Sequence, residues 1–90
     1  MAENVFIALQ NNEEARAIIA AIVEVNPHAV VNELPAMVKI DAPKRLVVKR
    51  ETVEEKMGRE FDLQEIHVNL ISLSGNIDET DEEFVLAWNF

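Results

Sequence analysis

The side chains in this sequence that could do chemistry are histidines, serines and acids, and their spacing forms no catalytic or metal-binding motif. His28 follows Pro27 at a predicted turn and His67 lies in a predicted strand, and neither belongs to an HxH or HExxH pattern. Ser72 and Ser74 lie outside any GxSxG turn that would expose a nucleophile. We therefore interpret both histidines as surface or packing residues, and we expect no enzymatic activity from the isolated chain.

An acidic run over residues 78–83 raises the question of calcium binding. An EF-hand register that starts at Asn76 would place Asp81 where the loop requires glycine. The same register would place Ala87 where the loop requires a bidentate glutamate. The register fails, so we interpret the run as a solvated loop that aids solubility.

The composition excludes several classes of protein. The sequence has no cysteine, which removes disulfides, thiolate nucleophiles and the usual ligands of iron–sulfur clusters. Its two glycines are too few for a phosphate-binding loop by motif. The formal net charge of −9 disfavours binding to nucleic acid or to an anionic membrane. This charge either serves solubility or steers the chain toward a basic patch on a protein partner.

The chain is expected to be one cytoplasmic domain, residues 1–90, with a modest core. No apolar run approaches the roughly 20 residues that span a bilayer. The opening MAENVFIALQ has no basic region ahead of its apolar stretch, so we expect no secretory signal.

Apolar spacing predicts a strand–helix–strand–strand order in the first half of the chain, residues 4–41. A short apolar run over residues 5–9 is typical of a buried strand. Asn11 and Glu14 resemble a capping box ahead of an apolar stripe at helical spacing, and Pro27 disfavours a helical residue before it. The predicted elements are the strand over 5–9, a helix between Asn11 and Asn26, and strands over 29–34 and 37–41, the last with Val38 and Ile40 on one face and Lys39 and Asp41 on the other.

The second half, residues 45–88, repeats this order without detectable sequence identity to the first. Thr52 and Glu55 form a capping box at the start of a helix, and Gly58 is placed to end that helix in left-handed geometry. The other predicted elements are a turn capped by Asp62 and Glu65, strands over 45–50 and 66–73, and a last strand whose Phe84, Leu86 and Trp88 face the core. Together the two halves predict an α+β fold in which helices pack on a mainly antiparallel sheet.

The longest of these predicted strands changes phase. Its apolar residues alternate from Ile66 to Leu70 and then jump to Ile71 and Leu73. One extra residue at this point predicts a β-bulge, which would re-aim the polar side chains between residues 69 and 72.

The chain resembles the regulatory, or effector, proteins of bacterial multicomponent monooxygenases, and the phenol hydroxylase branch most of all. The resemblance rests on the segments VFIALQNNEEARAIIAAIVEVNPHAVV, PAMVKIDAPKRLVVKRETVEEKMGREFD and VNLISLSGNIDE, which cover nearly the whole sequence. It implies a protein with no cofactor and no catalytic centre, which docks on a hydroxylase that holds a diiron centre. Docking would gate the access of oxygen, substrate and electrons and so raise aromatic hydroxylation. The reductase that supplies the electrons would meet this chain only indirectly.

The same resemblance implies where the hydroxylase binds. In the methane monooxygenase relative, polar residues of the strand that matches residues 68–73 face the hydroxylase, and Asn69 and Ser72 match polar residues there. This sequence departs from the pattern at Ile71 and Leu73, where that relative has small hydroxyl residues. The residues expected to bind the partner are Asn69, Ile71, Ser72, Leu73 and Ser74. We expect alanine at position 69 or 72 to leave folding nearly intact.

A second hypothesis comes from another class of protein. The order of strands and helices also suits a small-molecule-binding regulatory domain with ferredoxin-like topology, whose ligand would lie at a dimer interface. The scarcity of glycine counts against tight loops around a phosphate or an amino acid.

Overall fold

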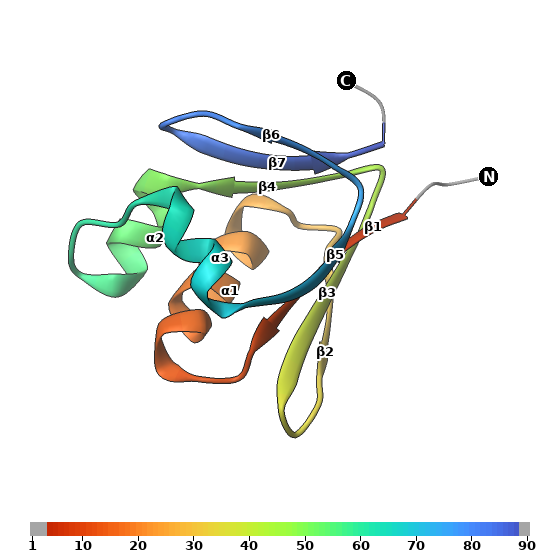
Figure 1. The fold of residues 1–90 in the computed structure, drawn as a ribbon, viewed down its shortest axis with the longest axis horizontal. Helices are drawn as coiled ribbons and strands as arrows, with labels where there is room; N and C mark the ends of the chain where they lie inside the picture. Colours follow the sequence, from red (N-terminus) through yellow and green to blue (C-terminus); the bar gives the residue numbers. More distant parts are fainter. Residues whose placement is uncertain (1–3, 89–90) are drawn as a thin grey trace.

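Residues 4–88 are described by the computed structural model, which has an α+β fold of two antiparallel sheets with helices packed against them (Figure 1). The elements in chain order are β1 (Asn4–Gln10), α1 (Glu13–Val25), β2 (Val30–Glu33), β3 (Met37–Pro43), β4 (Arg45–Lys49), α2 (Arg50–Met57), the 3-10 helix η1 (Leu63–Glu65), α3 (Ile66–Asn69), β5 (Leu70–Ser74), β6 (Asn76–Glu79) and β7 (Glu83–Ala87). The predicted fold class is confirmed, but the strands form two sheets where the sequence suggested one.

The four-stranded sheet has the order β2-β3-β1-β5, and each neighbouring pair is antiparallel. Side chains alternate along β1, so Val5, Ile7 and Leu9 are fully buried on one face. Across the ladder Ile7 lies opposite Ile40 and Leu9 lies opposite Val38. In Figure 1 the helices lie on one side of this sheet, where these residues join the hydrophobic core. The predicted alternation along β3 is confirmed.

The connections of this sheet form two interleaved crossovers. β1 and β2 are parallel and joined through α1, with β3 between them, and β3 and β5 are parallel with β1 between them. This is the ferredoxin-like strand order that the second hypothesis requires. The path from β3 to β5 is longer than in that plan, because β4 and all helices after it are inserted there.

The three-stranded sheet has the order β4-β7-β6 and closes the core from a second side. Leu46, Phe84 and Leu86 are fully buried on its inner face. Trp88 lies just beyond β7 and is 40% exposed, so its predicted packing in the core is wrong. Its indole Nε1 donates instead to the carbonyl of Asn4, over 2.9 Å.

The long helix α1 is fixed at both ends by asparagine. Asn12, rather than the predicted Asn11, is the N-cap, and its Oδ1 accepts from Ala15 N at 2.9 Å. At the other end Asn26 Nδ2 donates to the carbonyls of Ile22 and Val47, and Val47 N donates back to Asn26 Oδ1. These bonds join α1 to β4. With 13 residues in α1, the described part of the chain has no helix long and apolar enough to cross a membrane.

The second helix, α2, begins earlier than predicted. It follows β4 directly at Arg50, whose backbone N donates to the carbonyl of Glu82, and Thr52 is a buried residue inside the helix rather than its cap. The bond to Glu82 satisfies one of the backbone donors that lack an intrahelical partner at the helix start, where Lys49 makes no side-chain cap bond. The predicted end is confirmed, because Gly58 is left-handed with φ 75° and its N–H donates to Glu54.

The predicted strand over 66–73 is wrong in its first part. The expected capping box is present, since Asp62 accepts from Gln64 N and Glu65 accepts from Asp62 N, both at 2.9 Å. The helical turns that it starts continue to Asn69, so β5 begins only at Leu70.

The predicted bulge is present in β5. Leu70 lies opposite Leu9 and Ser72 lies opposite Ala8, which leaves Ile71 as an extra residue between the two pairs. Of the apolar residues that alternate before the phase change, however, only Leu70 lies in β5, because Ile66 and Val68 belong to α3.

Candidate functional site

The face of the four-stranded sheet that is turned away from the core is the first candidate, and we call it the outer face. Alternation along the strands places every second side chain there, and the cross-strand pairs fix their neighbours. On β1 and β5, Phe6 lies opposite Ser74 and Ala8 lies opposite Ser72. The outer face consists of Phe6, Ala8, Gln10, Val30, Asn32, Met37, Lys39, Asp41, Ser72 and Ser74.

The charged groups of the outer face are paired with each other. Lys39 Nζ lies 4.5 Å from the centroid of the Phe6 ring and 3.7 Å from Asp41 Oδ1. Asn32 Nδ2 donates to Asp41 Oδ2 over 3.3 Å. Neighbouring apolar side chains and one compensated ion pair suit a surface that binds another protein.

The structure brings only some of the predicted partner-binding residues to this face. Ser72 and Ser74 lie on it, and Ile71 lies at its edge in the bulge with 48% of its surface exposed. Leu73 points to the other side, opposite Ile7, and packs against the core. Contact between these residues and a partner stays a prediction.

Asn69 differs from the other predicted residues, because its side chain is buried. It is 4% exposed and lies at the end of α3, directly before β5. Asn12 Nδ2 donates to Asn69 Oδ1 over 2.8 Å, and Asn69 Nδ2 donates to Glu14 Oε1 over 3.1 Å. We therefore expect Asn69→Ala to destabilise the fold, in contrast to the expectation from the sequence, because the substitution would remove both bonds from a buried site.

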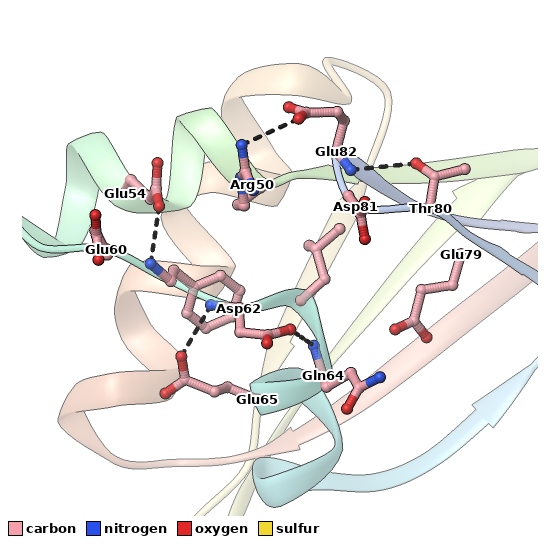
Figure 2. Close-up of a pocket in the computed structure, with 12 residues that line it drawn as sticks. Arg50, Glu54, Glu60, Asp62, Gln64, Glu65, Glu79, Thr80, Asp81 and Glu82 are labelled. Carbon is pink, nitrogen blue, oxygen red and sulfur yellow. Dashed lines mark hydrogen bonds and ion pairs between the residues drawn. The ribbon is translucent and has the colours of Figure 1, made fainter.

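An acidic groove of about 1010 Å³ is the second candidate (Figure 2). It lies between the start of α2, the η1 region and the β6–β7 turn. Seven of its twelve lining residues are acidic, namely Glu54, Glu60, Asp62, Glu65, Glu79, Asp81 and Glu82. The sequence showed the acidic run and the Asp62 cap separately, but their meeting depends on the tertiary fold.

Several carboxylates of the acidic groove are already used by the fold. Glu54 Oε2 accepts from Phe61 N over 2.9 Å, and Asp62 and Glu65 form the capping box. Glu82 Oε1 lies 3.0 Å from Arg50 Nη2, an interaction that Figure 2 shows as a dashed line. Within residues 4–88 we find no group of three or more potential ligands placed to hold a metal ion. The acidic groove is thus a charged surface held together by caps and an ion pair.

His67 links α3 to the second sheet. Its Nε2 lies 3.3 Å from Glu79 Oε1, and its ring meets Phe84 edge-on with centroids 6.0 Å apart. A separate ion pair joins α1 to α2, where the hydrogen bond from Lys56 to Glu24 raises the pKa of Lys56 above its usual value of 10.5. Both contacts join elements of the fold.

The outer face could be found only in part from the sequence. The alternation of residues 37–41 already placed Lys39 and Asp41 on one face. Phe6 and Ala8 were missed, because their run is apolar throughout and shows no alternation. Only the pairing of β1 with β3 and β5 reveals that they lie beside Lys39 and the two serines.

Sequence comparisons match nearly the whole chain to one family. The model of the MmoB/DmpM family matches residues 3–87. The stimulatory component DmpM of phenol 2-monooxygenase from Pseudomonas sp. (strain CF600) is 52% identical over 88 residues, which are 98% of each chain.

Solved structures agree with these matches. A chain in the structure of a phenol hydroxylase–regulatory protein complex has a TM-score of 0.92 at 49% identity, and the match covers 97% of this chain and 100% of that chain. The soluble methane monooxygenase regulatory protein B has a TM-score of 0.76 at 21% identity, over 96% of this chain and 65% of its own. At that identity the second match supports the fold alone.

Proposed function

This chain belongs to the MmoB/DmpM family, and on that premise we propose that it is the non-enzymatic effector of a phenol-type multicomponent monooxygenase. It docks on the hydroxylase component and raises the rate of aromatic hydroxylation. The hydroxylase, and not this chain, holds the diiron centre, and docking gates the access of oxygen, substrate and electrons to it.

One observation carries this proposal. A chain from a phenol hydroxylase–regulatory protein complex matches 97% of this chain at 49% identity, with a TM-score of 0.92. The 52% identical relative is a stimulatory component, which gives the same direction of effect. Two observations fit a protein that works by binding. Several carboxylates accept hydrogen bonds from amide groups within the fold, and the sequence has no catalytic motif.

The physical basis of the stimulation is a shift between conformations of the hydroxylase. A docked protein favours one conformation only by as much as it binds that conformation more tightly than the others. We assign the contact to the outer face and the neighbouring edge of β5, with Ser72, Ser74 and Ile71 at its centre. A stable interface buries about 800 Å² on each partner, which requires most of the outer face and not β5 alone.

The net charge of −9 adds a long-range component to docking. Attraction to a basic patch on the hydroxylase speeds association at low ionic strength, and salt screens it beyond about 10 Å at 0.1 M. The association rate measured by stopped flow is therefore expected to fall as salt rises. A rate that does not depend on salt would assign the charge to solubility.

Two further parts of the proposal concern the chain as a whole. We propose that residues 1–90 act as one regulatory domain, because both halves of the chain contribute to a single core cluster. We also propose a cytoplasmic location, which the absence of cysteine supports because it fits a reducing compartment.

The test is an oxygenation assay with the hydroxylase and the reductase of a phenol monooxygenase, with and without this chain. Product formation and the ratio of product to reductant consumed should both rise until the chain saturates the hydroxylase. No change in either quantity at any ratio of chain to hydroxylase would refute the proposal. The same titration with heat-denatured chain controls for nonspecific protein effects.

The small-molecule-binding alternative retains one supporting observation, the strand order β2-β3-β1-β5. The lining of the acidic groove disfavours it, because ligand sites are usually mostly apolar with a few polar groups. Stabilisation of the isolated chain by phenol in a thermal-shift assay would support this alternative.

A further inference from the structure

Asn12, Glu14 and Asn69 form a hydrogen-bonded group that we call the clamp, and it lies where four elements begin or end. β1 ends two residues before Asn12, and α1 begins directly after it. α3 ends at Asn69, and β5 begins at the next residue. The two bonds of the Asn69 amide therefore fix the start of β5 relative to the end of β1.

The start of β5 decides which of its side chains face outward. The pairing of β5 with β1 begins with Leu70 opposite Leu9, and the bulge then places Ser72 opposite Ala8 on the outer face. Without the extra residue, Ile71 would lie opposite Ala8, and Ser72 would turn toward the core opposite Ile7, because a shift of one residue reverses every side chain. The register at this end of β5 thus decides whether serines or large apolar side chains form the outer face.

The position of Asn69 argues against direct contact with a partner. Its side chain is 4% exposed, and both its oxygen and its nitrogen are bonded within the fold. The partners are the N-cap of α1, Asn12, and Glu14 in its first turn, and Asn12 is itself held by its bond to Ala15. Because both polar atoms of the Asn69 side chain are bonded inside the fold, Asn69 influences the docking surface by fixing the backbone of β5, which begins at the next residue.

We propose that Asn12, Glu14 and Asn69 are positioning residues of the docking surface, which hold β5 in the register that presents Ser72 and Ser74 to the hydroxylase. This inference rests on the proposed function, in that the docking surface is the outer face and the edge of β5. Asn69 affects docking without touching the hydroxylase, and Glu14 affects it from a different element.

The polarity of the bond between Asn69 and Glu14 provides a specific test. Asn69→Asp keeps an oxygen for Asn12 but places two carboxylates 3.1 Å apart, where an amide nitrogen donated before. Glu14→Gln in the same background supplies a new donor to that oxygen and restores the bond with reversed direction. Glu13→Gln removes the same charge from the same turn of α1 and is the matched control.

Two measurements read out the effect. Titration of each variant into hydroxylase and reductase gives the half-saturating concentration and the maximal rate separately. Backbone amide resonances of residues 70–74 in the isolated protein report the register of β5 without any partner. A role confined to overall stability would lower the unfolding midpoint but leave both readouts unchanged in the folded protein.

For Asn69→Asp we expect the half-saturating concentration to rise about tenfold, since a hydrogen bond to a charged group contributes enough for such a change. The amides of residues 70–74 should shift as well. Glu14→Gln in that background should restore both readouts, and Glu13→Gln should restore neither. Unchanged docking in Asn69→Asp, or equal recovery with Glu13→Gln, would overturn the proposal.

A milder variant covers the case in which Asn69→Asp does not fold. Glu14→Ala removes only the acceptor of Asn69 Nδ2 from the half-buried surface of α1, and it should produce the same amide shifts and weaker docking. Unchanged amides in Glu14→Ala would overturn the clamp. Failure of the wild-type chain to stimulate hydroxylation would refute the proposed function instead, while the amide shifts of the isolated protein would still test the clamp.

Discussion

Replacement of Gly75 by alanine is expected to destabilise the protein far more than the same replacement at Gly58. Gly75 joins β5 to β6 with φ 137°, where the chain passes from one sheet to the other. A Cβ at Gly75 would lie 3.0 Å from both Leu86 Cγ and Val5 Cγ1, and both of these residues are fully buried. Gly58 also has positive φ, at 75°, but an added Cβ there meets nothing within 4 Å.

The magnitudes follow from these two differences. A backbone conformation that only glycine adopts readily costs another residue about 1–3 kcal/mol. Forcing a methyl group into a packed core adds about 1–3 kcal/mol. Gly75→Ala should therefore cost about 2–6 kcal/mol in the free energy of unfolding, out of roughly 5–15 kcal/mol for a typical domain. Gly58→Ala incurs only the left-handed backbone cost of about 1–2 kcal/mol.

Urea unfolding followed by far-UV circular dichroism measures both variants on the same scale. The midpoint should fall much further for Gly75→Ala, with little change in the dependence of the free energy on urea. Because β5 precedes Gly75 directly, the folded fraction of this variant should also stimulate hydroxylation less than Gly58→Ala does. Equal loss of stability in the two variants would refute the reasoning from the close contacts at Leu86 and Val5.

Three further predictions concern single side chains. Asn26→Ala removes three hydrogen bonds, one to Ile22 and two to Val47. It should lower the free energy of unfolding by about 3 kcal/mol, at about 1 kcal/mol for each bond, and an unchanged midpoint of urea unfolding would contradict this. Ser72→Ala should leave the free energy of unfolding within about 0.5 kcal/mol of wild type but alter the rate of hydroxylation, and equal rates would remove Ser72 from the contact. Lys56 has a raised pKa in the folded protein, so its pair with Glu24 contributes stability that is present below the unfolded pKa of 10.5 and is lost as pH rises through the folded value. Thermal unfolding of Lys56→Met should lack this alkaline loss, and an equally steep loss in the variant would show that other groups cause it.

Features that depend on nearby residues were predictable from the sequence. The left-handed end of α2 at Gly58 requires one glycine after a helical stretch. The capping box of Asp62 and Glu65 requires two residues three positions apart. The bulge at Ile71 lies where the apolar pattern breaks after Leu70, although the residues before Leu70 are helical. Each of these signals lies within a few residues of the structure that it specifies.

Residues 66–69 show where a local pattern is ambiguous. Ile66 and Val68 are spaced as in a strand, but Leu63 and Ile66 are spaced as on one face of a helix. The structure buries Leu63 and Ile66 and leaves Val68 70% exposed, so packing decides in favour of the helix. For this reason the strand begins at Leu70 and not at Ile66, where the sequence pattern predicted it.

The role of Asn69 could not be found from sequence spacing, because its partner Asn12 lies 57 positions away. A polar residue among apolar neighbours reads equally well as an exposed contact or as a buried, hydrogen-bonded group. The second interpretation requires knowledge that the start of α1 and the end of α3 are adjacent. The same limit applies to the acidic groove, where Glu79 and Asp62 meet only in the folded chain.

The bond from the indole of Trp88 to the carbonyl of Asn4 has a consequence for the kinetics of folding. It joins residues 84 positions apart, so its formation closes a loop of nearly the whole chain. The entropic cost of such a closure is about 4 kcal/mol for a flexible chain and exceeds that of any shorter contact. This cost becomes smaller once the strands have paired, because strand pairing shortens the flexible chain between Asn4 and Trp88. Since Trp88 is the single tryptophan of the sequence, its emission is expected to report the late formation of this contact with Asn4.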